Sequence, residues 1–210
     1  MSDGSRPPIA LHVDGQAVEV PDRGQSLLSV LREDLHHVAA KDGCSPQGQC
    51  GCCTVLVDGQ PRVACVTPAR RVAGRAISTV DGLDPDRRDR WADAFTEAGA
   101  SQCGFCTPGI ICRLEGLAVR SPEADHAAVE QALLAHLCRC TGWRTILDAW
   151  DRRSGEGSSA ARDRCSTRAT TVSPRWPPPA TGSLGPHADN VAASTSAATP
   201  GASPRESWVQ

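Results

Sequence analysis

The sequence predicts an α+β fold: a small β-rich domain, then a helical domain, then a polar tail. Two segments predict the β-rich part, "IALHVDGQAVEV" and "TVLVDGQPRVACV", because each alternates apolar residues around an Asp-Gly turn, a strong signal for a β-hairpin. The helical part is predicted by apolar residues that recur at helical spacing in four segments after residue 84.

The first part contains one predicted helix between its two hairpins. In "SLLSVLREDL" the apolar residues share one helical face, and Ser26 can cap the N-terminus. Two hairpins and a helix indicate a β-grasp arrangement, with a cysteine-rich loop running from the helix into the second hairpin. We expect this domain to span residues 6–83, because turn signals at Asp81-Gly82 and Asp84-Pro85 mark a boundary.

The second domain, residues 84–153, is predicted to be a four-helix bundle. Its helices are expected in "DRRDRWADAFTEAG", "TPGIICRLEGLAV", "SPEADHAAVEQALLAHL" and from "RTILDAW" onward. Thr107 can cap the second helix and Pro108 suits its first turn, while the third is expected to run from Ser121 to Cys138. Helices this short need a shared core, which a bundle provides.

Residues 154–210 differ in composition from the rest of the chain. They are rich in Pro, Gly and Ser and poor in Leu, Ile, Val and Phe. Such a segment cannot bury enough apolar surface to offset the entropy of ordering it. We therefore expect a disordered tail, which is either a genuine extension or the product of a reading-frame error.

Charge and hydropathy exclude several classes of protein. A net charge of -2 over 210 residues does not indicate a general binder of nucleic acid or of membrane surfaces. No apolar run approaches the roughly 18 residues of a membrane span, and the N-terminus lacks the features of a secretory signal. We expect a cytoplasmic protein, in which clustered cysteines favour metal binding over disulfides.

Most of the eleven cysteines fall into two groups. The first group is Cys44, Cys50, Cys52, Cys53 and Cys65. Plant-type [2Fe–2S] ferredoxins use Cys-x4-Cys-x2-Cys and a distant cysteine, and positions 44, 50, 53 and 65 give Cys-x5-Cys-x2-Cys-x11-Cys. The glycines of this loop let the backbone fold closely around a cluster, whose sulfides then accept N–H hydrogen bonds.

The second group is Cys103, Cys106, Cys112, Cys138 and Cys140. Without position 112 it gives Cys-x2-Cys-x31-Cys-x-Cys, two pairs of ligands from two turns between helices, which can hold a second cluster. Cys106 precedes a predicted helix, whose dipole stabilises a thiolate. Cys52 and Cys112 are interpreted as buried small apolar residues. Zinc also takes four cysteines at Cys-x2-Cys spacing, so structural zinc is an alternative.

Three motifs in order, "GCSPQGQCGCCTVLVDGQPRVAC", "QCGFCTPG" and "LCRCTGW", closely resemble the small iron–sulfur subunit of the molybdenum hydroxylases. This group includes xanthine dehydrogenase, aldehyde oxidase and aerobic carbon monoxide dehydrogenase. The resemblance covers about residues 8–150 and implies a plant-type ferredoxin domain followed by a four-helix [2Fe–2S] domain. The ligands that it implies are Cys44, Cys50, Cys53 and Cys65 for the first cluster, and Cys103, Cys106, Cys138 and Cys140 for the second.

One spacing departs from the family pattern. Five residues, rather than the usual four, separate Cys44 from the next cysteine of the motif, and Cys52 stands where the family commonly has a small non-cysteine residue. Cys52 thus competes with Cys50 as a ligand, and we keep Cys50 because Cys50-x2-Cys53 preserves the second spacing. The resemblance also implies that Gln102 hydrogen-bonds the pterin, the alternative being a surface amide.

The function implied by this resemblance is electron transfer without catalysis by this chain alone. Electrons would pass from the molybdopterin of a large partner subunit, through the second cluster and then the first, to FAD on a medium subunit. The complex would be xanthine dehydrogenase-like or carbon monoxide dehydrogenase-like. The alternatives are a zinc-stabilised binding module without redox activity and a stand-alone ferredoxin. The six histidines are scattered and offer no hydrolytic constellation.

Overall fold

The computed structural model of the chain describes residues 6–153, and the tail expected at 154–210 lies outside the described residues. The first part of the described chain builds a five-stranded sheet. Its strands are β1 (Ile9–Val13), β2 (Gln16–Val20), β3 (Thr54–Val57), β4 (Gln60–Val63) and β5 (Ala76–Ser78), in the order β2-β1-β5-β3-β4. The sheet is mixed, because β5 pairs parallel to β1 and antiparallel to β3.

Both predicted hairpins are confirmed. In each turn the aspartate and the glycine have positive φ, 49° and 81° at Asp14-Gly15 and 48° and 73° at Asp58-Gly59. This backbone twist matches the right-handed twist of the flanking strands, which is why Asp-Gly favours two-residue turns. Strand β5 was not predicted from the sequence. It has only three residues, yet it joins the two hairpins into one sheet, pairing His12 with Ala76 and Val57 with Ile77.

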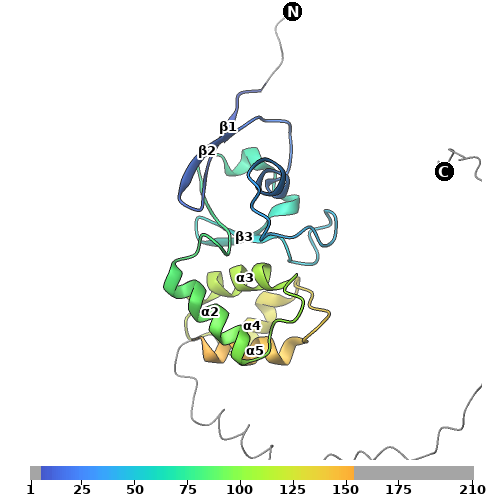
Figure 1. The fold of residues 1–210 in the computed structure, drawn as a ribbon, viewed down its shortest axis with the longest axis vertical. Helices are drawn as coiled ribbons and strands as arrows, with labels where there is room; N and C mark the ends of the chain where they lie inside the picture. The colour runs from blue at the N-terminus through green and yellow to red at the C-terminus, as the bar shows by residue number, and fades with distance from the viewer. Residues whose placement is uncertain (1–5, 154–210) are drawn as a thin grey trace, which may run out of the picture. The chain divides into compact units, whose positions relative to one another are not determined.

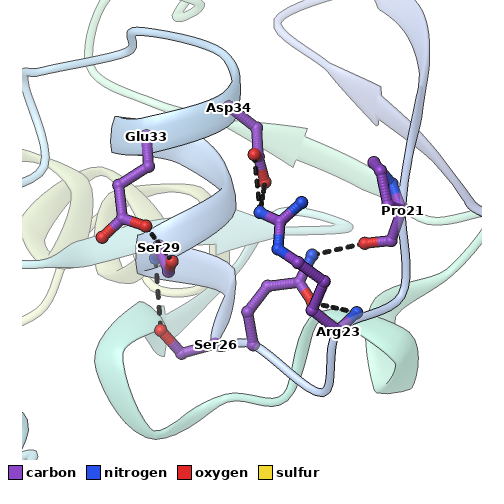
Figure 2. A network of polar contacts seen from close by, with 7 residues as sticks. Pro21, Arg23, Ser26, Ser29, Glu33 and Asp34 are labelled. Carbon is purple, nitrogen blue, oxygen red and sulfur yellow. Dashed lines mark hydrogen bonds and ion pairs between the residues drawn. The ribbon is translucent and has the colours of Figure 1, made fainter.

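The predicted helix before the cysteine loop is confirmed, and its N-terminus is fixed by polar contacts (Figure 2). It begins as α1 (Leu27–Ser29) and continues as a π-helical turn, η1 (Val30–Asp34). Ser26 caps it, because its hydroxyl accepts a hydrogen bond from the Ser29 N–H at 3.2 Å. Arg23 donates to the Asp34 carboxylate at 2.7 and 3.0 Å, which ties the preceding loop to the end of the helix.

The second part of the described chain contains α2 (Pro85–Glu97), α3 (Thr107–Arg120), α4 (His126–Leu133) and α5 (Trp143–Arg152) (Figure 1). Three expectations about their ends are wrong. The third helix starts after Asp125, whose side chain accepts from Ala128 N, because Ser121 is used to end α3. It ends at Leu133, so the chain approaches Cys138 outside a helix. Cys106, not Thr107, occupies the N-cap of α3.

Buried side chains form two hydrophobic cores. The core of the sheet side is dominated by Leu, Ile and Val from β1, β3, β5 and α1, and the core of the helical side by Trp91, Phe95, Trp150 and aliphatic residues of α2 to α5. The cysteine loop contributes to both. Cys53 and Cys65 belong to the sheet core, whereas Cys50 and Cys52 belong to the helical core. The coarse prediction of a mixed α and β architecture is thus confirmed.

Helix α3 joins the helical side to the sheet through two glycines, two helical turns apart. A Cβ at Gly116 would lie 2.4 Å from Pro61 Cγ, and a Cβ at Gly109 would lie 2.2 Å from the Gly51 carbonyl oxygen. Only glycine permits such an approach of helix and backbone. Figure 1 shows α3 next to β3, and beyond these contacts Arg120 donates to Gln60 on β4 at 3.1 Å. Along residues 6–153, no helix has the length and apolarity that a membrane span requires.

The packing of Gly116 yields a stability prediction. Alanine normally stabilises a helix interior by about 1 kcal/mol relative to glycine. Here we expect Gly116→Ala to lower the free energy of unfolding by about 1–3 kcal/mol, because the added methyl overpacks the contact with Pro61. Urea denaturation measures the change. Val119→Ala, on the exposed side of the same helix, is the control and should change it by less than about 0.5 kcal/mol. A stabilised Gly116→Ala variant would contradict this packing.

Candidate metal centres

Three predicted ligands of the first set lie in the loop between η1 and β3, and the fourth, Cys65, follows β4. Their side chains interact in two pairs. Cys53 ends the loop just before β3, and Cys65 lies in a 3-10 turn, η2 (Ala64–Val66), that follows β4. The Cys65 N–H donates to Cys53 Sγ at 3.4 Å, and the Ala64 N–H donates to the Cys53 carbonyl at 3.2 Å. The β3–β4 ladder therefore continues into the cysteines and sets their spacing.

The second pair of this set is formed by Cys44 and Cys50, whose side chains interact. Backbone N–H groups of the intervening loop surround the Cys44 sulfur. The N–H of Gln49, together with those of Cys50 and Gln47, outweighs burial and lowers the pKa of Cys44 to about 7. Amide donors that converge on a sulfur stabilise its thiolate form, which is the form that binds metal. Cys50 itself is buried, with 6% of its surface exposed.

The second cysteine set lies at the ends of helices and is again paired. Cys103 and Cys140 are exposed, and their sulfurs are 3.5 Å apart. Cys106, at the N-cap of α3, is buried and interacts with Cys138. Burial raises the pKa of Cys106 to about 12. Burial also acts to raise the pKa of Cys138, but hydrogen bonds from the hydroxyl and N–H of Thr141 lead the contacts that lower it to about 7.

This pairing fits the donor set of a two-iron cluster. Each iron of a [2Fe–2S] cluster is held by two thiolates, and two thiolates on one tetrahedral metal at ~2.3 Å lie about 3.8 Å apart. The 3.5 Å between the sulfurs of Cys103 and Cys140 is close to that value. Within the described residues, no three side chains of His, Cys, Asp or Glu gather closely enough to hold one metal ion.

The two cysteine sets touch through their backbones. The Leu137 N–H, one residue before Cys138, donates to the Cys50 carbonyl at 3.0 Å. Gly51 has φ of 69°, and a Cβ there would lie 2.3 Å from Cδ2 of His136 and 2.7 Å from the Ala135 carbonyl oxygen. The first turn of α3 packs on the same loop through Gly109. One backbone hydrogen bond thus links Cys50, a predicted ligand of the first set, to Leu137, which precedes Cys138 of the second set.

His136 was not singled out by the sequence, yet it lies at this junction. Its side chain is buried, with 4% of the residue exposed, and Nε2 lies 3.2 Å from the Thr54 hydroxyl of β3. Nδ1 has no hydrogen-bond partner among the described residues. Burial, reinforced by the charge of Arg113, lowers the pKa of His136 to about 4, so the imidazole is neutral at pH 7. Its position two residues before Cys138 was the only signal in the sequence.

The other residues of the two cysteine sets and their neighbours in the sequence divide between surface and core. Gln102 is exposed next to Cys103, and Arg139 and Arg144 are also exposed. Phe105 and Trp143 are unusually exposed for aromatic residues, at 43% and 38%. In the sequence Phe105 lies between Cys103 and Cys106, and Trp143 follows Cys140. The other cysteines, Cys52 and Cys112, are buried, with 4% and 1% of their surface exposed.

Comparison with known proteins decides the family. A model described as "2Fe-2S iron-sulfur cluster binding domain" matches residues 11–74, and one described as "[2Fe-2S] binding domain" matches residues 79–151. The chain is 37% identical over 140 residues to "Nicotinate dehydrogenase small FeS subunit" of Eubacterium barkeri, covering 66% of this chain and 88% of that protein. The chain belongs to the family of small [2Fe–2S] subunits of the molybdenum hydroxylases.

Further relatives support this membership of the iron–sulfur family. The chain is 39% identical over 136 residues to a probable xanthine dehydrogenase subunit of Bacillus subtilis, covering 64% of this chain and 78% of that one. Quinoline 2-oxidoreductase from Pseudomonas putida 86 has a chain of similar structure, with a TM-score of 0.63 and 33% identity, covering 75% of this chain and 96% of that one. The family inferred from the sequence and the two [2Fe–2S] clusters are thereby confirmed.

The packing around Gly51 yields a prediction for the iron–sulfur protein. We expect Gly51→Ala to weaken or abolish the electron paramagnetic resonance (EPR) signal of one cluster, because the new methyl collides with His136 and displaces the first cysteine loop. Gly74→Ala is the matched control, since Gly74 has φ of 71° with nothing within 4 Å of the added Cβ. Both variants carry the ~1–2 kcal/mol cost of a left-handed alanine, so only the first should lose iron. Equal iron contents would contradict the collision.

Burial of His136 yields a pH prediction. Its pKa of about 4 in the folded chain lies below the ordinary value near 6.5, so the unfolded chain binds the proton more tightly. The stability contribution of neutral His136 is therefore full above about pH 6.5 and is lost as pH falls toward 4, by up to about 3 kcal/mol. Urea midpoints measured across this window should fall less steeply for His136→Gln than for wild type. His12→Gln, at an exposed position, should follow the wild-type slope.

Proposed function

We propose that this chain relays single electrons from a large molybdopterin-binding subunit to a medium FAD-binding subunit of a molybdenum hydroxylase complex. The observation that carries the proposal is the contact between the backbones that carry the two sets of paired thiols, in which the Leu137 N–H donates to the Cys50 carbonyl. A [2Fe–2S] cluster supplies one-electron transfer at a potential set by hydrogen bonding and solvent exposure. The contact supports a relay, because it brings the two cluster-binding loops next to each other.

The ligands that we assign follow the pairing of the sulfurs. In the first set Cys44 and Cys50 hold one iron, and Cys53 and Cys65 hold the other. In the second set the pairs are Cys103 with Cys140 and Cys106 with Cys138. The contacts that support these pairs are the 3.5 Å between the Cys103 and Cys140 sulfurs, the Cys65 N–H on Cys53 Sγ, and the side-chain interactions of the other two pairs.

The residues around the thiols have two tasks in this proposal. Donors to sulfur, such as the N–H of Gln49 and the hydroxyl of Thr141, favour thiolates and so favour metal binding. Burial excludes water from Cys50, Cys53 and Cys65. Because solvent exposure is one determinant of the reduction potential of a cluster, this burial shifts the potential of the first cluster relative to that of an exposed one. The chain thus tunes two centres differently, since one set is largely buried and the other contains two exposed cysteines.

The exposed side of the second set suits a partner subunit. Gln102, Phe105 and Trp143 are exposed and lie within three residues of Cys103 or Cys140 in the sequence. We assign this face to the molybdopterin subunit, with Gln102 on the pterin, and the first set to the side of the FAD subunit. The names of the relatives support the presence of partner subunits, because they are subunits of xanthine dehydrogenase, nicotinate dehydrogenase and aldehyde oxidoreductase.

The proposed domain organisation is a β-grasp ferredoxin domain at residues 6–83 and a four-helix-bundle domain at 84–153. Two matches, to residues 11–74 and 79–151, and the two hydrophobic cores support this division. A reducing compartment such as the cytoplasm suits a chain whose thiols must stay available to iron.

Cysteine substitutions test the ligand assignment. We expect Cys65→Ser to remove one of two EPR signals of the dithionite-reduced, anaerobically purified protein, and Cys106→Ser to remove the other. Each variant should keep about two irons per chain, half of the roughly four that two clusters contain. Cys112→Ser, at a buried cysteine inside α3, is the control and should keep both signals.

The same samples separate the competing functions. Zinc in place of iron in the wild-type chain, with no EPR signal, would overturn electron transfer in favour of a structural metal module. Two signals in a protein that never associates with larger subunits when expressed with its genomic neighbours would support a stand-alone ferredoxin instead.

A further inference from the structure

Cys52 is the cysteine of the first loop that the ligand assignment leaves unused, and its sulfur borders the same space as that of Cys50. A Cβ built on Gly43 would lie 3.0 Å from Cys50 Sγ and 3.4 Å from Cys52 Sγ, with Phe105 Cε1 at 3.1 Å on another side. Gly43 precedes Cys44 in the chain. The thiols of Cys50 and Cys52 therefore both lie close to Gly43, the residue next to Cys44.

The contacts of Cys50 place it between the other two thiols. Its side chain interacts with that of Cys44 and also with that of Cys52. In addition, Cys52 Sγ donates to the Cys50 carbonyl at 3.6 Å. Cys53, the next residue, instead faces the sheet core, where Cys65 is its partner. Cys50 is thus the predicted ligand whose side chain hydrogen-bonds that of Cys52, whereas Cys106 and Cys53 interact with it only electrostatically.

We propose that Cys52 is an alternative ligand that holds the first cluster in place of Cys50 when the Cys50 sulfur is lost. The inference rests on the proposed function, because it assumes that this loop binds a [2Fe–2S] cluster. In the exchange, the Cys52 thiol gives its proton to solvent and forms one iron–sulfur bond, in place of the bond that Cys50 no longer makes. Iron keeps its oxidation state, and the number of thiolate ligands remains four.

The loop has the freedom that this exchange requires on the side of Cys44. Five residues separate Cys44 from Cys50, one more than in Cys-x4-Cys ferredoxins, and Ser45, Pro46, Gln47 and Gln49 are at least partly exposed. Gly48 has φ of 69°, a conformation that glycine adopts without strain. The side of Cys52 is fixed, because a Cβ at Gly109 of α3 would lie 3.0 Å from its Cα. We therefore infer that the Cys44 segment, not Cys52, moves when the ligand changes.

The alternative interpretation of Cys52 is a buried thiol that serves only as a small apolar residue. Cys112 has that character, since it lies inside α3 and is fully buried there. The two interpretations differ in what happens when Cys50 is removed. A residue that only fills space leaves the cluster with three thiolates, whereas an alternative ligand restores four.

Alanine substitutions in the full chain, purified anaerobically, test the proposal. We expect Cys50→Ala to keep about four irons per chain, with shifted g values for one EPR signal because one ligand has changed. Cys52→Ala should keep the wild-type signals. The double variant Cys50→Ala with Cys52→Ala should lose about two irons and one signal. Cys53→Ala is the matched control, because its sulfur lies on the sheet side with Cys65 as its partner, and it should lose one cluster alone.

The outcomes are distinguishable from failure of the proposed function. If the wild-type chain holds no iron, the proposed function itself falls. If wild type holds both clusters but Cys50→Ala loses as much iron as Cys53→Ala, the alternative ligand is overturned. Loss of iron from Cys52→Ala with wild-type signals in Cys50→Ala would also overturn it, by making Cys52 the resident ligand. The signal of the second cluster, retained in each variant, shows that the chain has folded.

Discussion

The absence of a side chain at Gly51 is the constraint on which the junction of this protein depends. Its left-handed backbone and missing Cβ let His136 pack directly on the cysteine loop, and Gly109 lets the first turn of α3 pack on the same loop. That approach brings the Leu137 N–H within 3.0 Å of the Cys50 carbonyl. Any side chain at position 51 would separate the two cysteine sets, because the space is already filled by an imidazole and a carbonyl.

The division of the cysteine loop between two cores follows from the same packing. Cys53 enters β3, so its side chain joins the sheet core, whereas the residues just before it face α3 and join the helical core. The conformation of this loop therefore depends on the packing of both cores. The geometry of the first set therefore depends on helices that lie more than fifty residues away in the sequence.

Solvent access distinguishes the two centres. In the first set Cys50, Cys53 and Cys65 are buried, and in the second Cys103 and Cys140 are exposed. Iron–sulfur potentials respond to solvent exposure and to hydrogen bonds on sulfur, so the two sites are expected to differ in potential even with the same ligands. A partner that covers the exposed pair would change the second potential more than the first. The complex, rather than the isolated chain, then sets the driving force between the centres.

The sequence by itself determined the elements and the chemistry that depend on local pattern. Asp14-Gly15 and Asp58-Gly59 specified two hairpins, because few other residue pairs tolerate positive φ twice in succession. Cysteine spacing and the three motifs indicated two [2Fe–2S] clusters and the family, both confirmed by comparison. Only the tertiary structure decided the rest. Strand β5, the junction at His136 and the place of Cys52 beside Cys50 depend on contacts between distant segments, which periodicity and spacing do not encode.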